Sequence, residues 1–183
     1  MKGFLHCTGD DQAARLRRRI RWLTALFIVG LVLSGLTAIP LVAEVDWLAR
    51  LVGAFGAATA ESSRPFADWL ARVQSALHDA SARYPFAFYG TDWLAFGHFV
   101  IAVAFVGAWR DPVRNRWLFD FGLIACALVV PYALVFGGLR GIPLWWRLVD
   151  CSFGVFGAMP LWLCRRWTRD LERTDNLRSE SAA

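Results

Sequence analysis

The chain has 183 residues, of which 57% are hydrophobic and 15% aromatic, and its mean hydropathy is +0.40. This composition lies outside the usual range of soluble domains, and the length leaves no room for a separate catalytic domain beside a membrane domain. The net charge of +5 does not indicate nucleic-acid binding, because the basic residues gather at the ends of apolar segments.

Four apolar runs have the length of a membrane crossing. They predict transmembrane helices at about 22–43, 91–109, 115–137 and 145–164. A hydrocarbon core of about 30 Å needs about 20 helical residues, and a helix satisfies its own backbone hydrogen bonds in lipid. The sequence therefore predicts an all-α polytopic membrane protein, an antiparallel four-helix transmembrane bundle that forms a single membrane domain over residues 1–183.

The basic residues are distributed unequally between the two sides of this bundle. Fourteen lie in the tails 1–21 and 165–183 and in the link between the second and third helices, whereas six lie in the connection 44–90 and around Arg140. Because Lys and Arg accumulate in cytoplasmic segments, both termini are expected in the cytoplasm of a multi-pass inner-membrane protein. Signal-peptide cleavage is not expected, since the first apolar run exceeds a signal core and no clear A-x-A site follows.

The connection 44–90 is too long for a bare loop. In its second half an apolar and a polar face recur at helical spacing: Phe66, Trp69, Leu70, Val73 and Leu77 on one side, and Asp68, Arg72, Gln74, Ser75 and Asp79 on the other. Ser62 or Ser63 is the predicted N-cap of this helix. We expect one or two external amphipathic helices, which lie on the outer membrane surface or cover the outer mouth of the bundle.

The link between the second and third helices contains a helix-start signal. Asp111 followed by Pro112 predicts that the third helix begins at Pro112, ahead of its apolar run. Asp120 follows Arg116 by four residues, so these two side chains are expected to pair near the headgroups.

Small residues mark the faces on which the helices should pack. These residues are Gly30, Ser34 and Ala38 on the first helix, Gly122, Cys126, Ala133 and Gly137 on the third, and Gly154, Gly157 and Ala158 on the fourth. Small side chains let two backbones approach closely, which favours association of helices in lipid. We therefore expect these residues to face neighbouring helices.

Three ionisable residues are predicted at depth within the membrane. Counting from Arg110 places His98 about 12 Å below the outer boundary. Counting from Arg165 places Asp150 about 8 Å below the same boundary, with Arg147 one turn away on the same face. Charges at such depth are costly and usually face inward and pair, so they are candidates for function.

Arg140 lies just outside this group, in a glycine-rich link. His98, Arg140, Arg147 and Asp150 are therefore the predicted ligand-binding residues. A purely structural alternative stays open, in which Arg147 and Asp150 form a local ion pair and His98 bonds to a neighbouring backbone group. No metal site is predicted, because one membrane histidine is too few for the usual zinc or bis-histidine haem site, and the chain has no C-x-x-C. The cofactor is left open.

Residues 19–26, RIRWLTAL, and 33–40, LSGLTAIP, resemble the first helix of b-type cytochromes of the cytochrome b561 kind. In those proteins a haem-ligating histidine precedes the tryptophan, whereas here Arg21 precedes Trp22. The resemblance implies a haem- or quinone-linked subunit in which His98 is the one intramembrane histidine left as a ligand.

A longer stretch, residues 89–157, resembles uncharacterised bacterial four-helix integral membrane proteins. The resemblance is carried by DPVRN at 111–115 and by WRLVDCSFG at 146–154. It implies a fold and no activity.

The leading functional hypothesis is a non-catalytic membrane subunit that binds a small ligand, a lipid or a membrane protein partner, including a second copy of itself. Arg140 and Arg147 beside Trp145 and Trp146 have the chemistry to hold a lipid phosphate. The alternatives are a haem- or quinone-linked redox subunit and a membrane enzyme in which His98 is a base beside Asp150. Whether the protein is an enzyme is left open.

Overall fold

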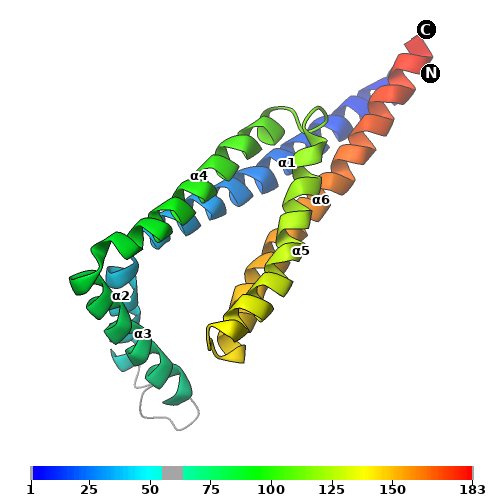
Figure 1. Cartoon of the computed structure of the whole chain (residues 1–183). Coiled ribbons are helices and arrows are strands. Elements are labelled where there is room, and N and C mark those ends of the chain that lie inside the picture. Colours follow the sequence, from blue (N-terminus) through cyan, green and yellow to red (C-terminus); the bar gives the residue numbers. More distant parts are fainter. Residues whose placement is uncertain (1, 55–63, 183) are drawn as a thin grey trace. The chain divides into compact units, whose positions relative to one another are not determined.

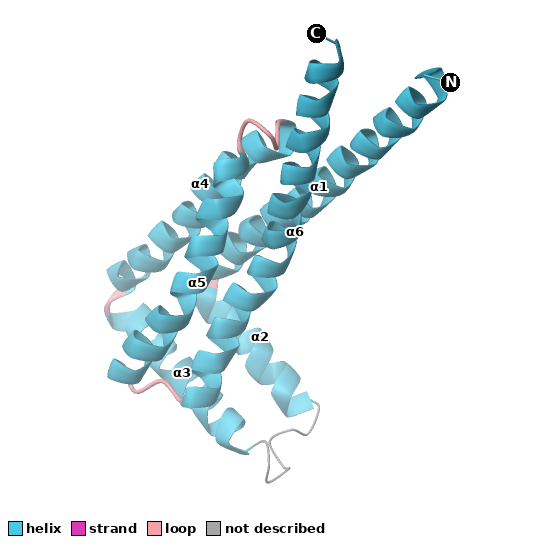
Figure 2. Ribbon diagram, turned by 90° about the vertical axis from the view of Figure 1, so that its right-hand side faces the viewer, coloured by secondary structure: helices cyan, strands magenta, loops and turns pink. Residues whose placement is uncertain are grey.

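The computed structural model describes residues 2–54 and 64–182, and nearly all of them are helical (Figure 1). Its elements in chain order are α1 (Lys2–Ala38), α2 (Leu41–Ala54), α3 (Arg64–Arg83), the 3-10 turn η2 (Pro85–Phe88), α4 (Tyr89–Arg110), α5 (Arg116–Leu139) and α6 (Leu144–Ala182). The loops from α4 to α5 and from α5 to α6 are short (Figure 2). The all-α prediction is confirmed.

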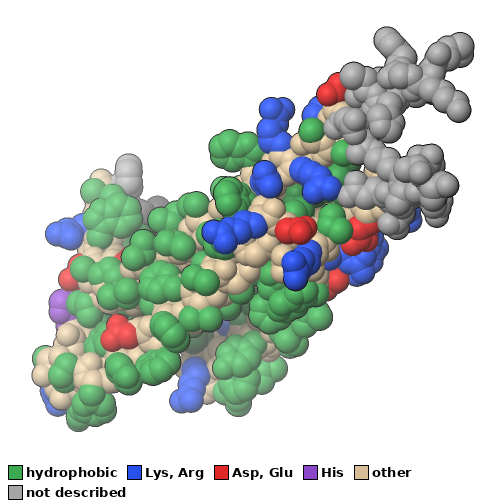
Figure 3. Space-filling view, turned by 90° about the horizontal axis from the view of Figure 1, so that it is seen from above, with side chains coloured by type: hydrophobic (Ala, Val, Ile, Leu, Met, Phe, Trp, Pro, Cys, Tyr) green, Lys and Arg blue, Asp and Glu red, His purple; other side chains and the backbone are tan. Residues whose placement is uncertain are grey.

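Four of the described segments are long and apolar enough to cross a membrane: Asp11–Ala38, Pro85–Arg110, Arg116–Leu139 and Leu144–Thr174. Their surfaces carry many exposed large apolar side chains, such as Val103 at 72%, Ile124 at 61% and Phe156 at 70% exposure. Hydrophobic side chains cover much of the face seen in Figure 3. Such surfaces favour an apolar medium, so the coarse prediction of a multi-pass membrane protein with four candidate spans is confirmed.

The ends of the first and last spans differ from the prediction. Helix α1 begins at Lys2 instead of residue 22, so the predicted tail is helical, and it ends at Ala38 instead of residue 43. Helix α2 begins as a separate helix at Leu41. Pro40 lies between them and explains the break, because proline lacks an N–H and disfavours a helical residue before it. At the other end, α6 continues to Ala182, far beyond the predicted end at 164.

Helix α5 begins at Arg116, so the prediction that it starts at Pro112 is wrong. Residues 111–115 form a turn in which Asp111 Oδ1 accepts the backbone N–H of Arg114 at 3.1 Å. Asn115 Nδ2 donates to the Gly107 carbonyl at 3.0 Å. The Asp and Asn side chains bond to nearby backbone groups and so stabilise a turn in place of a first helical turn.

The chain divides into two compact units, and each is described by itself. Unit 1 comprises residues 1–30 and 102–183, and unit 2 comprises residues 31–101. In unit 1, Phe105 of α4 is fully buried and contacts Phe27 of α1 and Phe119 of α5, at ring-centroid distances of 4.8 and 6.5 Å. This aromatic contact joins three helices of the unit.

Helices α5 and α6 pack closely through small residues. A Cβ on Gly154 would lie 2.6 Å from the Cys126 carbonyl oxygen, and one on Gly157 would lie 3.1 Å from Cys126 Sγ. A Cβ on Gly122 would lie 2.7 Å from Leu161 Cδ1. The predicted packing role of these small residues is confirmed for this helix pair, because a Cβ at each of the three glycines would crowd the neighbouring helix. It is wrong for Gly30 and Ser34 of α1, which are exposed.

In unit 2, α2 and α3 pack against each other, and the prediction of amphipathic helices in the connection is confirmed. Leu70 is buried, whereas Arg72 and Asp79 are exposed. Ser62 and Ser63, the predicted caps, lie outside the described residues.

Gln74 departs from the predicted polar face of α3. Its Nε2 donates to Asp46 Oδ1 of α2 at 2.7 Å, and His78 Nε2 lies 2.9 Å from the same oxygen. The hydrogen bond from Gln74, followed by that with His78, lowers the pKa of Asp46 below its ordinary value. The polar link therefore joins the two amphipathic helices.

The reactivity of single cysteines introduced on α3 should distinguish its exposed face from its buried face. Cysteines at Arg72 and Asp79 are expected to react rapidly with a membrane-impermeant thiol reagent, because both positions are exposed. Cysteines at the buried Leu70 and the half-buried Val73 are expected to react several-fold more slowly. The reactivity of the native cysteines, measured on the unmodified protein, is subtracted. Equal reactivity at all four positions would contradict a packed amphipathic helix.

Candidate functional site

The four residues predicted as a ligand site do not all lie in one unit. His98 belongs to unit 2, whereas Arg140, Arg147 and Asp150 belong to unit 1. A cluster that unites His98 with Arg147 and Asp150 therefore stays a prediction.

His98 is half-buried on α4, and its Nδ1 lies 2.8 Å from the Leu94 carbonyl oxygen one helical turn earlier. A carbonyl oxygen only accepts hydrogen bonds, so Nδ1 carries the donated proton. In the neutral ring Nε2 then holds the lone pair. The backbone hydrogen bond that the sequence left open as the structural alternative is present.

The turn between α5 and α6 is closed by backbone hydrogen bonds around Gly141. The N–H of Ile142 donates to the Gly137 carbonyl at 2.9 Å, and the N–H of Gly141 donates to the Gly138 carbonyl at 3.1 Å. Gly141 has a φ of 70°, a left-handed conformation that glycine adopts without strain. This is the Schellman arrangement of a helix C-terminus, and it brings the first turn of α6 back against α5.

Arg147 of α6 lies close enough to α5 to bond to its backbone. Its Nη1 donates to the Leu134 carbonyl at 3.1 Å, and its aliphatic stem covers Gly137, where a Cβ would lie 2.6 Å from Arg147 Cδ. The Nε of Arg147 is buried, and no described group accepts its hydrogen. Arg147 is thus bound to the backbone of α5 through one end of its guanidinium.

The local ion pair that the sequence left open between Arg147 and Asp150 does not form among the described residues. Asp150 is half-buried on α6, and Arg140 is exposed at the end of α5. Their roles in ligand binding stay predictions.

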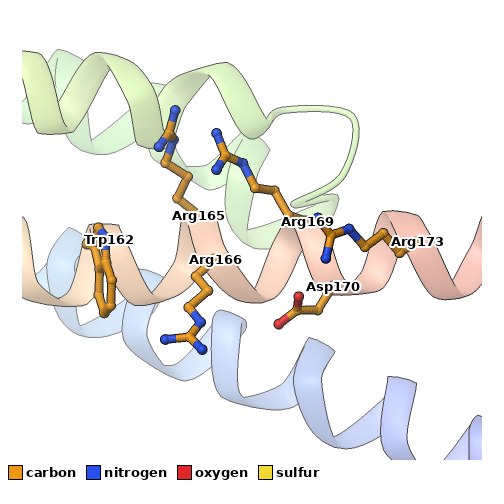
Figure 4. Close-up of a pocket in the computed structure, with 6 residues that line it drawn as sticks. All are labelled: Trp162, Arg165, Arg166, Arg169, Asp170 and Arg173. Atoms are coloured by element: carbon orange, nitrogen blue, oxygen red, sulfur yellow. The ribbon is translucent and has the colours of Figure 1, made fainter.

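The structure adds a second candidate site that the sequence interpretation missed. It lies further along α6 than Arg147 and Asp150, between residues 162 and 173 (Figure 4). A pocket of about 370 Å³ is lined by one face of the helix, with side chains at helical spacing: Trp162, Arg165, Arg166, Arg169, Asp170 and Arg173. We call it the arginine pocket. The sequence interpretation misses it because the polar residues beyond 164 predict a tail, although basic residues at helical spacing through Arg173 indicate a continuous helix face.

Two ion pairs join α5 to α6 in and beside this pocket. Arg165 pairs with Asp120, and Arg116 pairs with Glu172 at 2.7 Å. The prediction that Arg116 pairs with Asp120 within α5 is therefore wrong. The physical reason is the length of α6, which carries Arg165 and Glu172 alongside the first turns of α5.

The other arginines of the pocket leave its charge positive. Arg166 stacks over the Trp162 ring, 5.8 Å from its centroid, and Arg169 and Arg173 are exposed. Four arginines contribute +4, while Asp170 and the pairing Asp120 contribute −2, so the formal charge is +2. Guanidinium groups donate paired hydrogen bonds to phosphate oxygens, so the pocket has the chemistry of a phosphate site.

Within residues 2–54 and 64–182, no group of three His, Cys, Asp or Glu side chains is placed to hold a metal ion. Cys126, Cys151 and Cys164 are free thiols. No protein-family model, curated protein or solved structure matches the chain.

Proposed function

We propose that this protein is a non-catalytic multi-pass membrane subunit that binds anionic lipid through the arginine pocket. The observation that carries the proposal is the pocket's formal charge of +2 at one end of a membrane-length helix. The predicted lipid-binding function is thereby kept, and its main site moves from the outer residues around Arg147 to the basic end of α6. Arg147 is less suited to a ligand, because its guanidinium already bonds to the Leu134 carbonyl.

The position of the pocket along α6 supports a lipid headgroup as its ligand. About 20 helical residues cross the hydrocarbon core, so a crossing that starts at Leu144 reaches the far boundary near residue 164. Trp162 then lies at the membrane interface, where tryptophan is enriched, and Arg166, Arg169 and Arg173 lie at headgroup level. A basic pocket at this level is suited to anionic headgroups.

The topology that goes with this proposal is a single antiparallel four-helix domain in a bacterial inner membrane, with both termini in the cytoplasm. The distribution of fourteen basic residues against six supports it, and the arginine pocket lies among the fourteen. The Arg72 cysteine variant tests the orientation, because it should be labelled from outside intact cells. Labelling only after the cells are opened would contradict this topology.

Loss of two pocket arginines is expected to reduce lipid retention. The double variant Arg166→Gln/Arg169→Gln should retain at least about tenfold less phosphatidylglycerol, because even one hydrogen bond to a charged group contributes about 1.5–3 kcal/mol and about 1.4 kcal/mol is tenfold in affinity. The measurement is native mass spectrometry of bound lipid after extraction from nanodiscs that contain equal phosphatidylglycerol and phosphatidylcholine.

The matched control is Arg110→Gln/Arg114→Gln, which removes two exposed charges at the same end of the bundle but outside the pocket. We expect it to change lipid retention by less than a factor of about two, since exposed charges contribute little individually. Arg169→Lys should give an intermediate loss, because it keeps the charge and removes the paired donors. Equal losses in the two double variants would reduce the effect to general surface charge and would overturn the pocket.

A further inference from the structure

A second pocket, of about 210 Å³, lies at the start of α4 and entirely within unit 2. Its lining consists of Tyr89, Asp92, Trp93 and Phe96, which share one face of the helix at helical spacing. We call it the aromatic pocket. Its three rings and one carboxylate give it a chemistry opposite to that of the arginine pocket.

The ring of Trp93 is nearly perpendicular to its two neighbours, Tyr89 and Phe96. Tyr89 and Trp93 have centroids 6.0 Å apart with an interplanar angle of 86°, and Trp93 and Phe96 have centroids 5.4 Å apart with an angle of 85°. The three side chains are 62%, 55% and 54% exposed, so other parts of the protein do not cover the ring faces. The face of an aromatic ring carries negative electrostatic potential and attracts a cation.

The carboxylate of Asp92 strengthens this attraction. Asp92 lies in the first turn of α4 and is exposed. No described residue forms an ion pair or a hydrogen bond with its side chain, so its charge is available to a ligand. Ring faces together with one carboxylate suit a cation that is weakly hydrated, whereas a metal cation such as Mg²⁺ or Ca²⁺ needs several oxygen ligands.

We propose that the aromatic pocket binds an alkylated ammonium group of the choline type. Asp92 lies 18 residues before Arg110, about 27 Å along the helix, so the pocket lies near the membrane boundary opposite Arg110. A lipid headgroup and a free quaternary ammonium ion share the trimethylammonium chemistry that the pocket would recognise.

The test is a titration of the purified full-length protein, labelled with 5-fluorotryptophan, with tetramethylammonium chloride. The ¹⁹F resonance of Trp93, assigned by its loss in Trp93→Phe, should shift in a saturable manner. Sodium chloride at the same ionic strength should leave it in place. Asp92→Asn should weaken the apparent affinity about tenfold, because the ion pair with the ligand is lost.

The control variant is Asp68→Asn, which removes an exposed carboxylate on α3 outside the pocket and should leave the affinity unchanged. A shift that sodium chloride reproduces, or one that Asp92→Asn leaves intact, would overturn the proposal. Two nanodisc compositions identify the source of the group. Weaker tetramethylammonium binding in phosphatidylcholine than in phosphatidylglycerol assigns the pocket to a lipid headgroup, and equal binding assigns it to a free cation.

Discussion

Replacement of Gly154 by alanine is expected to destabilise the protein by about 2–3 kcal/mol, within the usual range for overpacking a close contact. The added Cβ would lie 2.6 Å from the Cys126 carbonyl oxygen. That oxygen belongs to the backbone of α5 and cannot rotate away, so the two helices must separate. The measurement is thermal and SDS-induced unfolding of the purified protein in a mild detergent.

Two other glycines provide graded controls for this experiment. Gly122→Ala should cost less, because its Cβ would meet only side chains, Leu161 Cδ1 at 2.7 Å and Phe105 Cζ at 3.0 Å, and side chains can shift further than a backbone carbonyl. No described atom lies within 4 Å of a Cβ at Gly30, so Gly30→Ala should be neutral or stabilising by up to about 1 kcal/mol. If Gly154→Ala is as stable as Gly30→Ala, α5 and α6 do not pack in the register described here.

The sequence predicts the packing faces of α5 and α6 well, although not that these two helices pair, because helical periodicity is rigid. Once α5 and α6 are helices, Gly122 and Cys126 on one and Gly154 and Gly157 on the other must fall on narrow faces. The same regularity accounts for the two amphipathic helices of the connection. Such features depend on local geometry alone, and local geometry can be read from spacing.

Partners that lie far apart in the chain are not fixed by spacing. The separation of four residues between Arg116 and Asp120 permits an ion pair within α5, yet each pairs with α6. Composition is also a poor guide to where a membrane-length helix ends. The polar residues after Cys164 predict a tail, but α6 contains no helix break there and continues.

This error about the end of α6 explains why the arginine pocket was missed. Taken singly, its arginines give a topology signal, and that signal does not place them on one helix face. The aromatic pocket was missed for a different reason, since Tyr89, Trp93 and Phe96 are also typical of an interfacial aromatic belt. A sequence pattern does not give the angles between the Trp93 ring and its two neighbours, and these angles distinguish a pocket from an aromatic belt.

Arg147 is the residue for which sequence and structure give different experimental expectations. In the structure its Nη1 donates to the Leu134 carbonyl, so Arg147→Met should destabilise the protein by about 1.5–3 kcal/mol, the range for a hydrogen bond from a charged group. Methionine keeps much of the apolar stem that covers Gly137, which limits the loss of packing. Arg140→Met is the matched control, because Arg140 is exposed at the same turn and should change stability by less than about 0.5 kcal/mol.

A double-mutant cycle with Asp150→Asn separates the two arrangements. If Arg147 and Asp150 form one cluster, the double variant should cost less than the sum of the single variants, because Arg147→Met removes the charge that Asp150→Asn leaves unpaired. In the structure the two side chains share no partner, since the guanidinium of Arg147 bonds to α5. We therefore expect the effects to add within about 0.5 kcal/mol when unfolding is measured in the same detergent. A coupling above about 1 kcal/mol would contradict the contact with Leu134 and would return Arg147 and Asp150 to a common polar site.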